Sequence, residues 1–197
     1  AAYRIAMIFY EKGELDKGIA AMESMKTSYP GSDLIPSVEL KIIDMLMKKD
    51  SLAEAKERLL RFVEDYKNTA FIKVASKYLG DIMRKEKNIK EAIGYYKESL
   101  DDRRGDFNAG MQLTIGQLYE ESGDAENAIA EYMKVGYIYP DSIDIVAKAT
   151  LSCARLFEKQ NKTDEAVKLY KKVSEMDAKE SALAKERLRA IESNKVR

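Results

Sequence analysis

Residues 115–140 read IGQLYEESGDAENAIAEYMKVGYIYP, and this stretch decides the fold. Its first half carries Gly116 within an apolar, helix-like pattern, and its second half places the small Ala128 four residues before the bulky Tyr132. A spacing of four puts two residues on one face of a helix. Gly123, between the two halves, suits the left-handed end of a helix. The stretch therefore predicts two helices joined by a tight turn.

The same pattern recurs along the chain at a spacing of 36 to 38 residues. A period between 20 and 50 residues marks a repeat architecture, in which each unit buries its apolar face against the next. Glycine inside a helix costs about 1 kcal/mol relative to alanine, so Gly80 and Gly116 indicate positions too crowded for a methyl group. The recurring positions of the first helix are Ala6, Ile43, Gly80, Gly116 and Ala154. Those of the second helix are Gly18, Ala55, Ala92, Ala128 and Ala166.

Turn signals recur in the same register between the two helices of each unit. Glycine and asparagine at such points favour a left-handed cap. Ser51 with Glu54, and Asn88 with Glu91, have the spacing of a capping box, which predicts helix starts. The turn positions are Gly13, Asp50, Lys87, Gly123 and Asn161. The units are predicted over residues 1–31, 32–68, 69–104, 105–140 and 141–176, with a solvating cap over 177–197, all in one domain.

At these residues the chain resembles the tetratricopeptide repeat family, which pairs two antiparallel helices per unit with a small-small-aromatic-proline signature. The resemblance covers roughly residues 1–176 and implies an all-α, right-handed superhelix of about five helix pairs plus a C-terminal capping helix. The residues that carry it are Leu79-Gly80, Ile115-Gly116, Tyr119, Ala128, Tyr132 and Pro140. The period is longer than the family's 34 residues, and the tryptophan of the family signature is absent because the chain has no Trp. The Sel1-like repeat has a similar period, but its glycine-rich loop is missing here.

The Tyr-Pro-x-Ser junctions at 29–32 and 139–142 are similar to those of a bacterial cell-envelope subgroup with longer units. That likeness implies the periplasm or cell envelope, with the cytoplasm as the alternative. Because Ala1 already lies within a helix-like pattern, the chain is expected to be a piece of a longer protein.

Composition excludes several classes of function. Lys and Arg number 34 and Asp and Glu also number 34, which argues against a nucleic-acid partner, since a basic surface usually supplies much of that affinity. No run of about 18 uncharged apolar residues is present, so no membrane span is expected. Cys153 is the single cysteine; beside the small Ala154 it is expected to be a buried, inert thiol.

No catalytic chemistry is indicated. The chain has no histidine, the commonest general base and metal ligand, and a single cysteine cannot build a structural zinc site. Phosphate-binding and nucleophile motifs are absent. We therefore expect a protein that is not an enzyme and needs no cofactor or metal.

In the resembled family, the first helices line a concave groove that binds a protein or peptide. The matching positions here carry apolar and aromatic residues in the amino-terminal part and mixed charges beyond it. Such a surface suits a protein segment with a few apolar anchors and a polar rim. The alternative is a self-assembling structural scaffold. In it, copies of the chain form a homo-oligomer whose repeats stack end to end. The expected contact residues are Tyr3, Met7, Tyr10, Leu40, Asp44, Met47, Lys77, Asp81, Arg84, Gln117 and Arg155.

Overall fold

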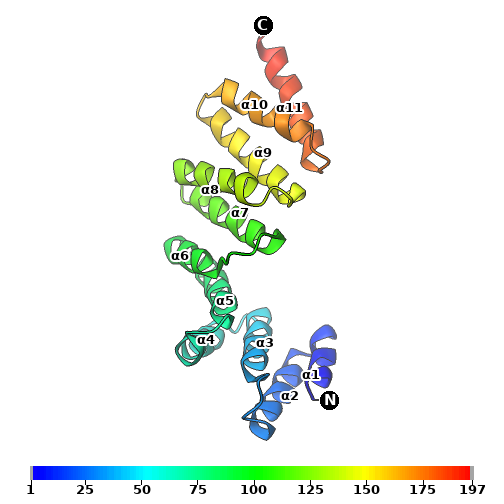
Figure 1. Ribbon diagram of the computed structural model, residues 1–197, viewed down its shortest axis with the longest axis vertical. Helices are drawn as coiled ribbons and strands as arrows, with labels where there is room; N and C mark the ends of the chain where they lie inside the picture. The colour runs from blue at the N-terminus through cyan, green and yellow to red at the C-terminus, as the bar shows by residue number, and fades with distance from the viewer. Residues whose placement is uncertain (1, 196–197) are drawn as a thin grey trace. The chain divides into compact units, whose positions relative to one another are not determined.

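The computed structural model describes residues 2–195, and within them it contains eleven α-helices and no strand (Figure 1). The chain divides into two compact units, Ala1–Ser99 and Leu100–Arg197. The predicted all-α repeat fold, with five helix pairs and a C-terminal helix, is confirmed. The assignment of the whole chain to one domain stays a prediction.

Unit 1 holds three helix pairs. Its helices are α1 (Ala2–Glu11), α2 (Leu15–Ser28), α3 (Ile35–Lys48), α4 (Leu52–Tyr66), α5 (Phe71–Lys85) and α6 (Ile89–Ser99). Each helix packs against the next one along the chain, and α3 also packs against α5. Pro36 lies in the first turn of α3, where its missing N–H has no intrahelical partner to lose.

Unit 2 holds two helix pairs and the C-terminal helix. Its helices are α7 (Asp106–Glu121), α8 (Ala125–Ile138), α9 (Ile143–Lys159), α10 (Thr163–Ser174) and α11 (Glu180–Lys195). The first helices α7 and α9 contact each other, and α11 contacts both α9 and α10. The terminal helix therefore packs on the last pair in the way a further first helix would.

The small residues that set the period lie in the core of the helix pairs. Ala55, Ala92, Ala128 and Ala166 have no exposed surface. A Cβ at Gly80 would lie 2.7 Å from the ring of Tyr96, and a Cβ at Gly116 would lie 2.6 Å from the ring of Tyr132. Real Cβ atoms do not approach so closely, so the expected crowding at both glycines is confirmed.

The turns within the helix pairs share one backbone geometry. Each predicted turn position has a positive φ, at 74° for Gly13, 61° for Asp50, 62° for Lys87, 82° for Gly123 and 61° for Asn161. The residue after each turn donates its N–H to a carbonyl five residues earlier, as Asn88 does to Met83 at 2.8 Å. These are the bonds of a Schellman motif, which satisfies carbonyls at the end of the first helix.

One predicted helix cap lacks its side-chain hydrogen bond. Ser51 precedes α4 as expected, but its side chain makes no capping hydrogen bond. A side-chain cap occurs instead at Asp124, whose Oδ1 accepts a 3.1 Å bond from the backbone N–H of Asn127. The spacing between Ser51 and Glu54 does not fix the rotamer of the serine side chain. The motif therefore predicted where the helix starts but not whether the capping hydrogen bond forms.

Cys153 is buried at 2% exposure, as predicted. Burial raises the pKa of its thiol from 9.0 to about 11. Within residues 2–195, none of the helices is long and apolar enough to cross a bilayer.

Candidate functional site

The first-helix face of unit 1 begins with a polar network that joins α1 to α3. The hydroxyl of Tyr10 donates a 2.7 Å hydrogen bond to Oδ2 of Asp44, and Nζ of Lys41 bonds the same oxygen at 3.2 Å. Lys48 donates to the Tyr10 hydroxyl, and its Nζ lies 3.9 Å from the centre of the Tyr10 ring. This hydrogen bond raises the pKa of the Lys48 ammonium. Tyr10 and Asp44, both predicted contact residues, are therefore held side by side.

A second polar network holds Asp81 on α5. The hydroxyl of Tyr96, which reaches through from α6, donates a 2.8 Å bond to Oδ1 of Asp81. Nζ of Lys77 bonds Oδ2 at 2.7 Å. Both oxygens of the carboxylate are thus bonded, and its position on the surface is fixed by a buried ring. Because Gly80 makes room for that ring, the core packing of the pair determines where the charge lies.

Between these networks lies an open hollow of about 470 Å³. Five of the predicted contact residues line it together: Asp44, Met47, Lys77, Asp81 and Arg84. The sequence did not predict the four further lining residues, Lys48, Tyr78, Lys85 and Tyr96. Burial raises the pKa of the Tyr78 phenol. The hollow therefore combines a thioether, an aromatic ring and several charges within one unit. We call it the unit 1 hollow.

Leu40 does not belong to this surface. It was expected in the groove, but only 7% of it is exposed and it lies in the core. Leu40 lies one turn before Asp44 on the same side of α3, and its apolar side chain is packed in the core there. Tyr3 and Met7 lie half-buried on α1 and do not line the unit 1 hollow.

In unit 2 the predicted residues are not brought together. Gln117 on α7 is half-buried and Arg155 on α9 is exposed. A hollow of about 520 Å³ contains Arg155 and not Gln117, and its lining comes from Leu151, Arg155, Glu158, Lys159, Tyr170, Leu183 and Arg187. The last two belong to α11, the expected solvating cap, and Arg187 is exposed there. Arg187 also bonds both oxygens of Glu158, at 2.5 and 3.0 Å, and lowers the pKa of that carboxyl.

A tyrosine-to-carboxylate bond recurs in three helix pairs. The hydroxyls of Tyr132 and Tyr170 donate 2.8 Å bonds to Glu120 and Glu158, as that of Tyr96 does to Asp81. Burial, followed by the bond to Glu158, raises the pKa of Tyr170 to about 12. The signal in the sequence is the constant interval of 16 residues from the small residue of the first helix to this tyrosine. The pairs are Gly80 with Tyr96, Gly116 with Tyr132, and Ala154 with Tyr170.

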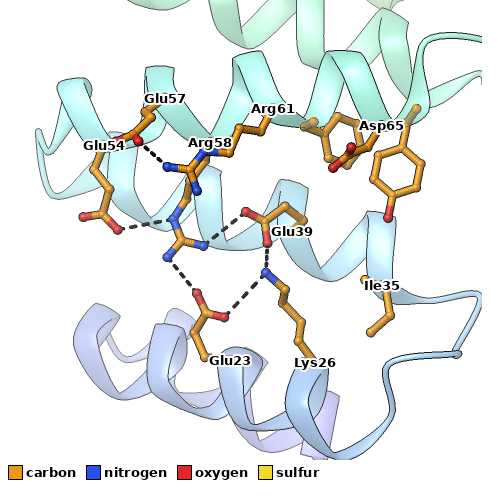
Figure 2. A pocket seen from close by; sticks show the side chains of 11 residues that line it. Glu23, Lys26, Ile35, Glu39, Glu54, Glu57, Arg58, Arg61 and Asp65 are labelled. Carbon is orange, nitrogen blue, oxygen red and sulfur yellow. Dashed lines mark hydrogen bonds and ion pairs between the residues drawn. The ribbon is translucent and has the colours of Figure 1, made fainter.

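A different hollow, of about 520 Å³, lies between α2, α3 and α4, and its charges pair with one another (Figure 2). Arg58 bonds Glu23 at 2.7 Å and Glu39 at 3.1 Å, and Lys26 bonds the same two carboxylates. Although burial opposes it, this pairing raises the pKa of the Arg58 guanidinium. The cluster therefore ties three helices together, and we assign it a structural role.

Three family models described as tetratricopeptide repeat match the chain, over residues 1–32, 109–142 and 149–184. A search of curated protein sequences finds no match.

Solved structures of similar fold include a MamA protein, at 24% identity and a TM-score of 0.66, with 86% of this chain and 92% of MamA covered. A tetratricopeptide repeat protein from Parabacteroides merdae is 14% identical at a TM-score of 0.67, with 87% of this chain and 64% of that protein covered. YrrB, described as a TPR protein with an unusual peptide-binding site, is 14% identical at a TM-score of 0.61, with 87% and 82% covered. At these identities the likeness shows the fold.

Proposed function

Because the chain belongs to the tetratricopeptide repeat family, we propose that it is a protein-interaction module that binds a segment of another protein in the unit 1 hollow. The observation that supports this is the convergence of five predicted contact residues, Asp44, Met47, Lys77, Asp81 and Arg84, around one open hollow. The description of YrrB includes a peptide-binding site, which agrees with a peptide ligand for this fold. We assign no catalytic step to the chain.

The lining of the hollow favours an acidic ligand with an apolar anchor. Four basic side chains face two acidic ones: Lys48, Lys77, Arg84 and Lys85 against Asp44 and Asp81. Opposite charge across an interface speeds encounter and excludes partners of like charge. Met47 and Tyr78 supply apolar surface beside these charges, and methionine adapts to ligands of irregular shape.

The ligand is expected to meet a prearranged surface. Asp81 is held from both sides by Tyr96 and Lys77, and Asp44 is held by Tyr10 and Lys41. Side chains that are already ordered lose less conformational entropy when a ligand binds. This prearranged surface favours binding of a defined peptide motif over nonspecific binding.

The experiment selects peptides from a displayed random library on the immobilised chain and measures a selected, labelled peptide by fluorescence anisotropy. Met47→Glu and, separately, Arg84→Glu should each raise the dissociation constant at least about tenfold, because each makes the hollow more acidic. Leu60→Glu is the matched control. Leu60 is 48% exposed on α4, away from the unit 1 hollow, so this variant should bind like the parent chain.

Two results would contradict the proposal. One is a library that yields no peptide bound by the parent chain. The other is a selected peptide whose affinity falls with Leu60→Glu and is unchanged by Met47→Glu. Circular dichroism on each variant separates a loss of binding from a loss of fold.

A further inference from the structure

Two pairs of an aspartate and a lysine occupy matching positions on the two helices that form the walls of the unit 1 hollow. Asp44 and Lys48 lie four residues apart on α3, and Asp81 and Lys85 repeat this arrangement on α5. All four residues line the hollow. An acid placed four residues before a lysine on a helix favours an ion pair between them. Within residues 2–195, however, neither aspartate bonds the lysine that follows it.

On α3, the hydroxyl of Tyr10 separates the acid from the lysine. It donates a 2.7 Å hydrogen bond to Oδ2 of Asp44 and accepts a hydrogen bond from the ammonium of Lys48. The same ammonium lies 3.9 Å from the centre of the Tyr10 ring. Because a hydroxyl carries one donor and two acceptor sites, Tyr10 serves both groups at once. One neutral group therefore holds the two opposite charges of α3 apart.

The pair on α5 is kept apart by other partners. The hydroxyl of Tyr96 donates a 2.8 Å bond to Oδ1 of Asp81, and Lys85 bonds Oδ1 of Asp50 at 2.9 Å. Each aspartate of the hollow is thus held by a tyrosine hydroxyl from another helix. Tyr96 is a core residue with 2% exposure, so changing it also disturbs packing. Tyr10 is only half-buried, and the role of its hydroxyl can be tested alone.

We propose that Tyr10 is a positioning residue that sets the preference of the unit 1 hollow for acidic ligands, because its hydroxyl keeps the Lys48 ammonium available to them. This inference rests on the proposed function. An ammonium has three protons, and its bonds to carboxylates are stronger than its bonds to neutral acceptors. A ligand carboxylate can therefore bond Lys48 without displacing another negative charge. If Lys48 were paired directly with Asp44, the ligand would have to compete with a carboxylate that the helix holds in place.

The proposal extends the ligand site to a helix that does not line it. The lining of the hollow comes from α3, α5 and α6, whereas Tyr10 belongs to α1. Tyr10 acts on the ligand only through Asp44 and Lys48. Its loss should therefore change the selectivity of the hollow for charge and leave the apolar contacts with Met47 in place.

The test compares Tyr10→Phe with the parent chain by fluorescence anisotropy. The probes are a selected acidic peptide and a copy in which its acidic residues are replaced by their amides. Without the hydroxyl, Lys48 is expected to pair with Asp44. Tyr10→Phe should then raise the dissociation constant of the acidic peptide about two- to fivefold, the range typical of exposed ion pairs, and leave that of the amide copy unchanged. Tyr29→Phe is the matched control, because Tyr29 is 61% exposed beyond α2 and does not line the hollow; it should bind like the parent chain.

Asp44→Asn distinguishes a positioning role from a packing role. Asparagine keeps the shape of the side chain and removes the charge that would capture Lys48. In this background, Tyr10→Phe should leave the dissociation constant of the acidic peptide unchanged. A crystal structure of the Tyr10→Phe chain gives a second measurement that needs no ligand. It should place Nζ of Lys48 within about 4 Å of the Asp44 carboxylate. Circular dichroism checks the fold of each variant.

Three results would overturn the proposal. They are a Tyr10→Phe chain that binds the acidic peptide like the parent chain, an equal loss of affinity in the Asp44→Asn background, and a Tyr10→Phe structure in which Lys48 stays apart from Asp44. Failure of the proposed function has a different signature, which is a parent chain that binds no peptide or a Met47→Glu variant that binds like the parent. The structure of the Tyr10→Phe chain reports on Lys48 in either case.

Discussion

Gly80→Ala tests whether the buried tyrosines position the surface carboxylates. A Cβ at Gly80 would lie 2.7 Å from Cδ1 and 2.8 Å from Cε1 of Tyr96. Carbon atoms in contact prefer about 3.5–4.0 Å, so the ring has to retreat by about 1 Å. Tyr96 is only 2% exposed, which leaves it little room. A shift of this size also stretches the 2.8 Å bond from its hydroxyl to Asp81 beyond hydrogen-bonding range.

The expected cost combines three terms. Overpacking a core costs about 1–3 kcal/mol, and the lost bond to a charged carboxylate adds about 1 kcal/mol or more. Replacing glycine by alanine within a helix stabilises the helix by about 1 kcal/mol, which offsets part of this cost. Gly80→Ala should therefore lower the free energy of unfolding by about 1–3 kcal/mol.

Gly94→Ala is the matched control. Gly94 lies within α6, and a Cβ there meets no atom within 4 Å, so this variant should gain up to about 1 kcal/mol from helix propensity alone. The assay is urea unfolding monitored by circular dichroism. The variants are compared at the same slope of unfolding free energy against urea concentration. Equal stability of Gly80→Ala and Gly94→Ala would refute the packing between Gly80 and Tyr96.

Three further predictions concern the turns and the core. Lys87→Gly should raise the free energy of unfolding by about 0.5–1 kcal/mol in urea melts, because Lys87 has a φ of 62° that glycine adopts without strain; an unchanged or lower value would contradict this. Cys153 should stay unlabelled by a thiol reagent at pH 8 until the chain unfolds, since burial raises its pKa to about 11; rapid native labelling would disprove it. From pH 10 to 12 the chain should lose stability, because burial and the bond to Glu158 raise the pKa of Tyr170 from 10.0 to about 12, so the stabilisation is complete below pH 10 and lost as pH rises through 12. Thermal melts of Tyr170→Phe should lose less stability over that range than those of the parent chain, and parallel curves would count against the bond.

The periodic features of the sequence predicted the backbone well. The small residues of the second helices, such as Ala128, are buried, because a period of 36 to 38 residues repeats one packing environment. Even Lys87, a residue type that does not favour positive φ, adopts the left-handed turn of its register. Register outweighs residue preference here because the packed helices on both sides fix the turn.

The polar contacts were harder to predict. Periodicity places a side chain on a face but does not say which atom its end reaches, so the bond from Tyr96 to Asp81 was missed. The bond from Arg187 to Glu158 was missed for the same reason. Leu40 was assigned to the groove by its offset, but the structure packs its side chain in the core, where it is only 7% exposed.

The most direct test of the central claim uses the methyl groups of methionine as reporters. Met47 lines the unit 1 hollow, while Met133 is 60% exposed on the second helix α8. With the methionine methyl groups labelled with ¹³C, a selected acidic peptide is titrated into the chain and the methyl resonances are followed by NMR. The proposal predicts that the Met47 resonance shifts in a saturable way while that of Met133 stays in place. A shift of Met133 without a shift of Met47 would contradict it and would move the binding surface to the second helices.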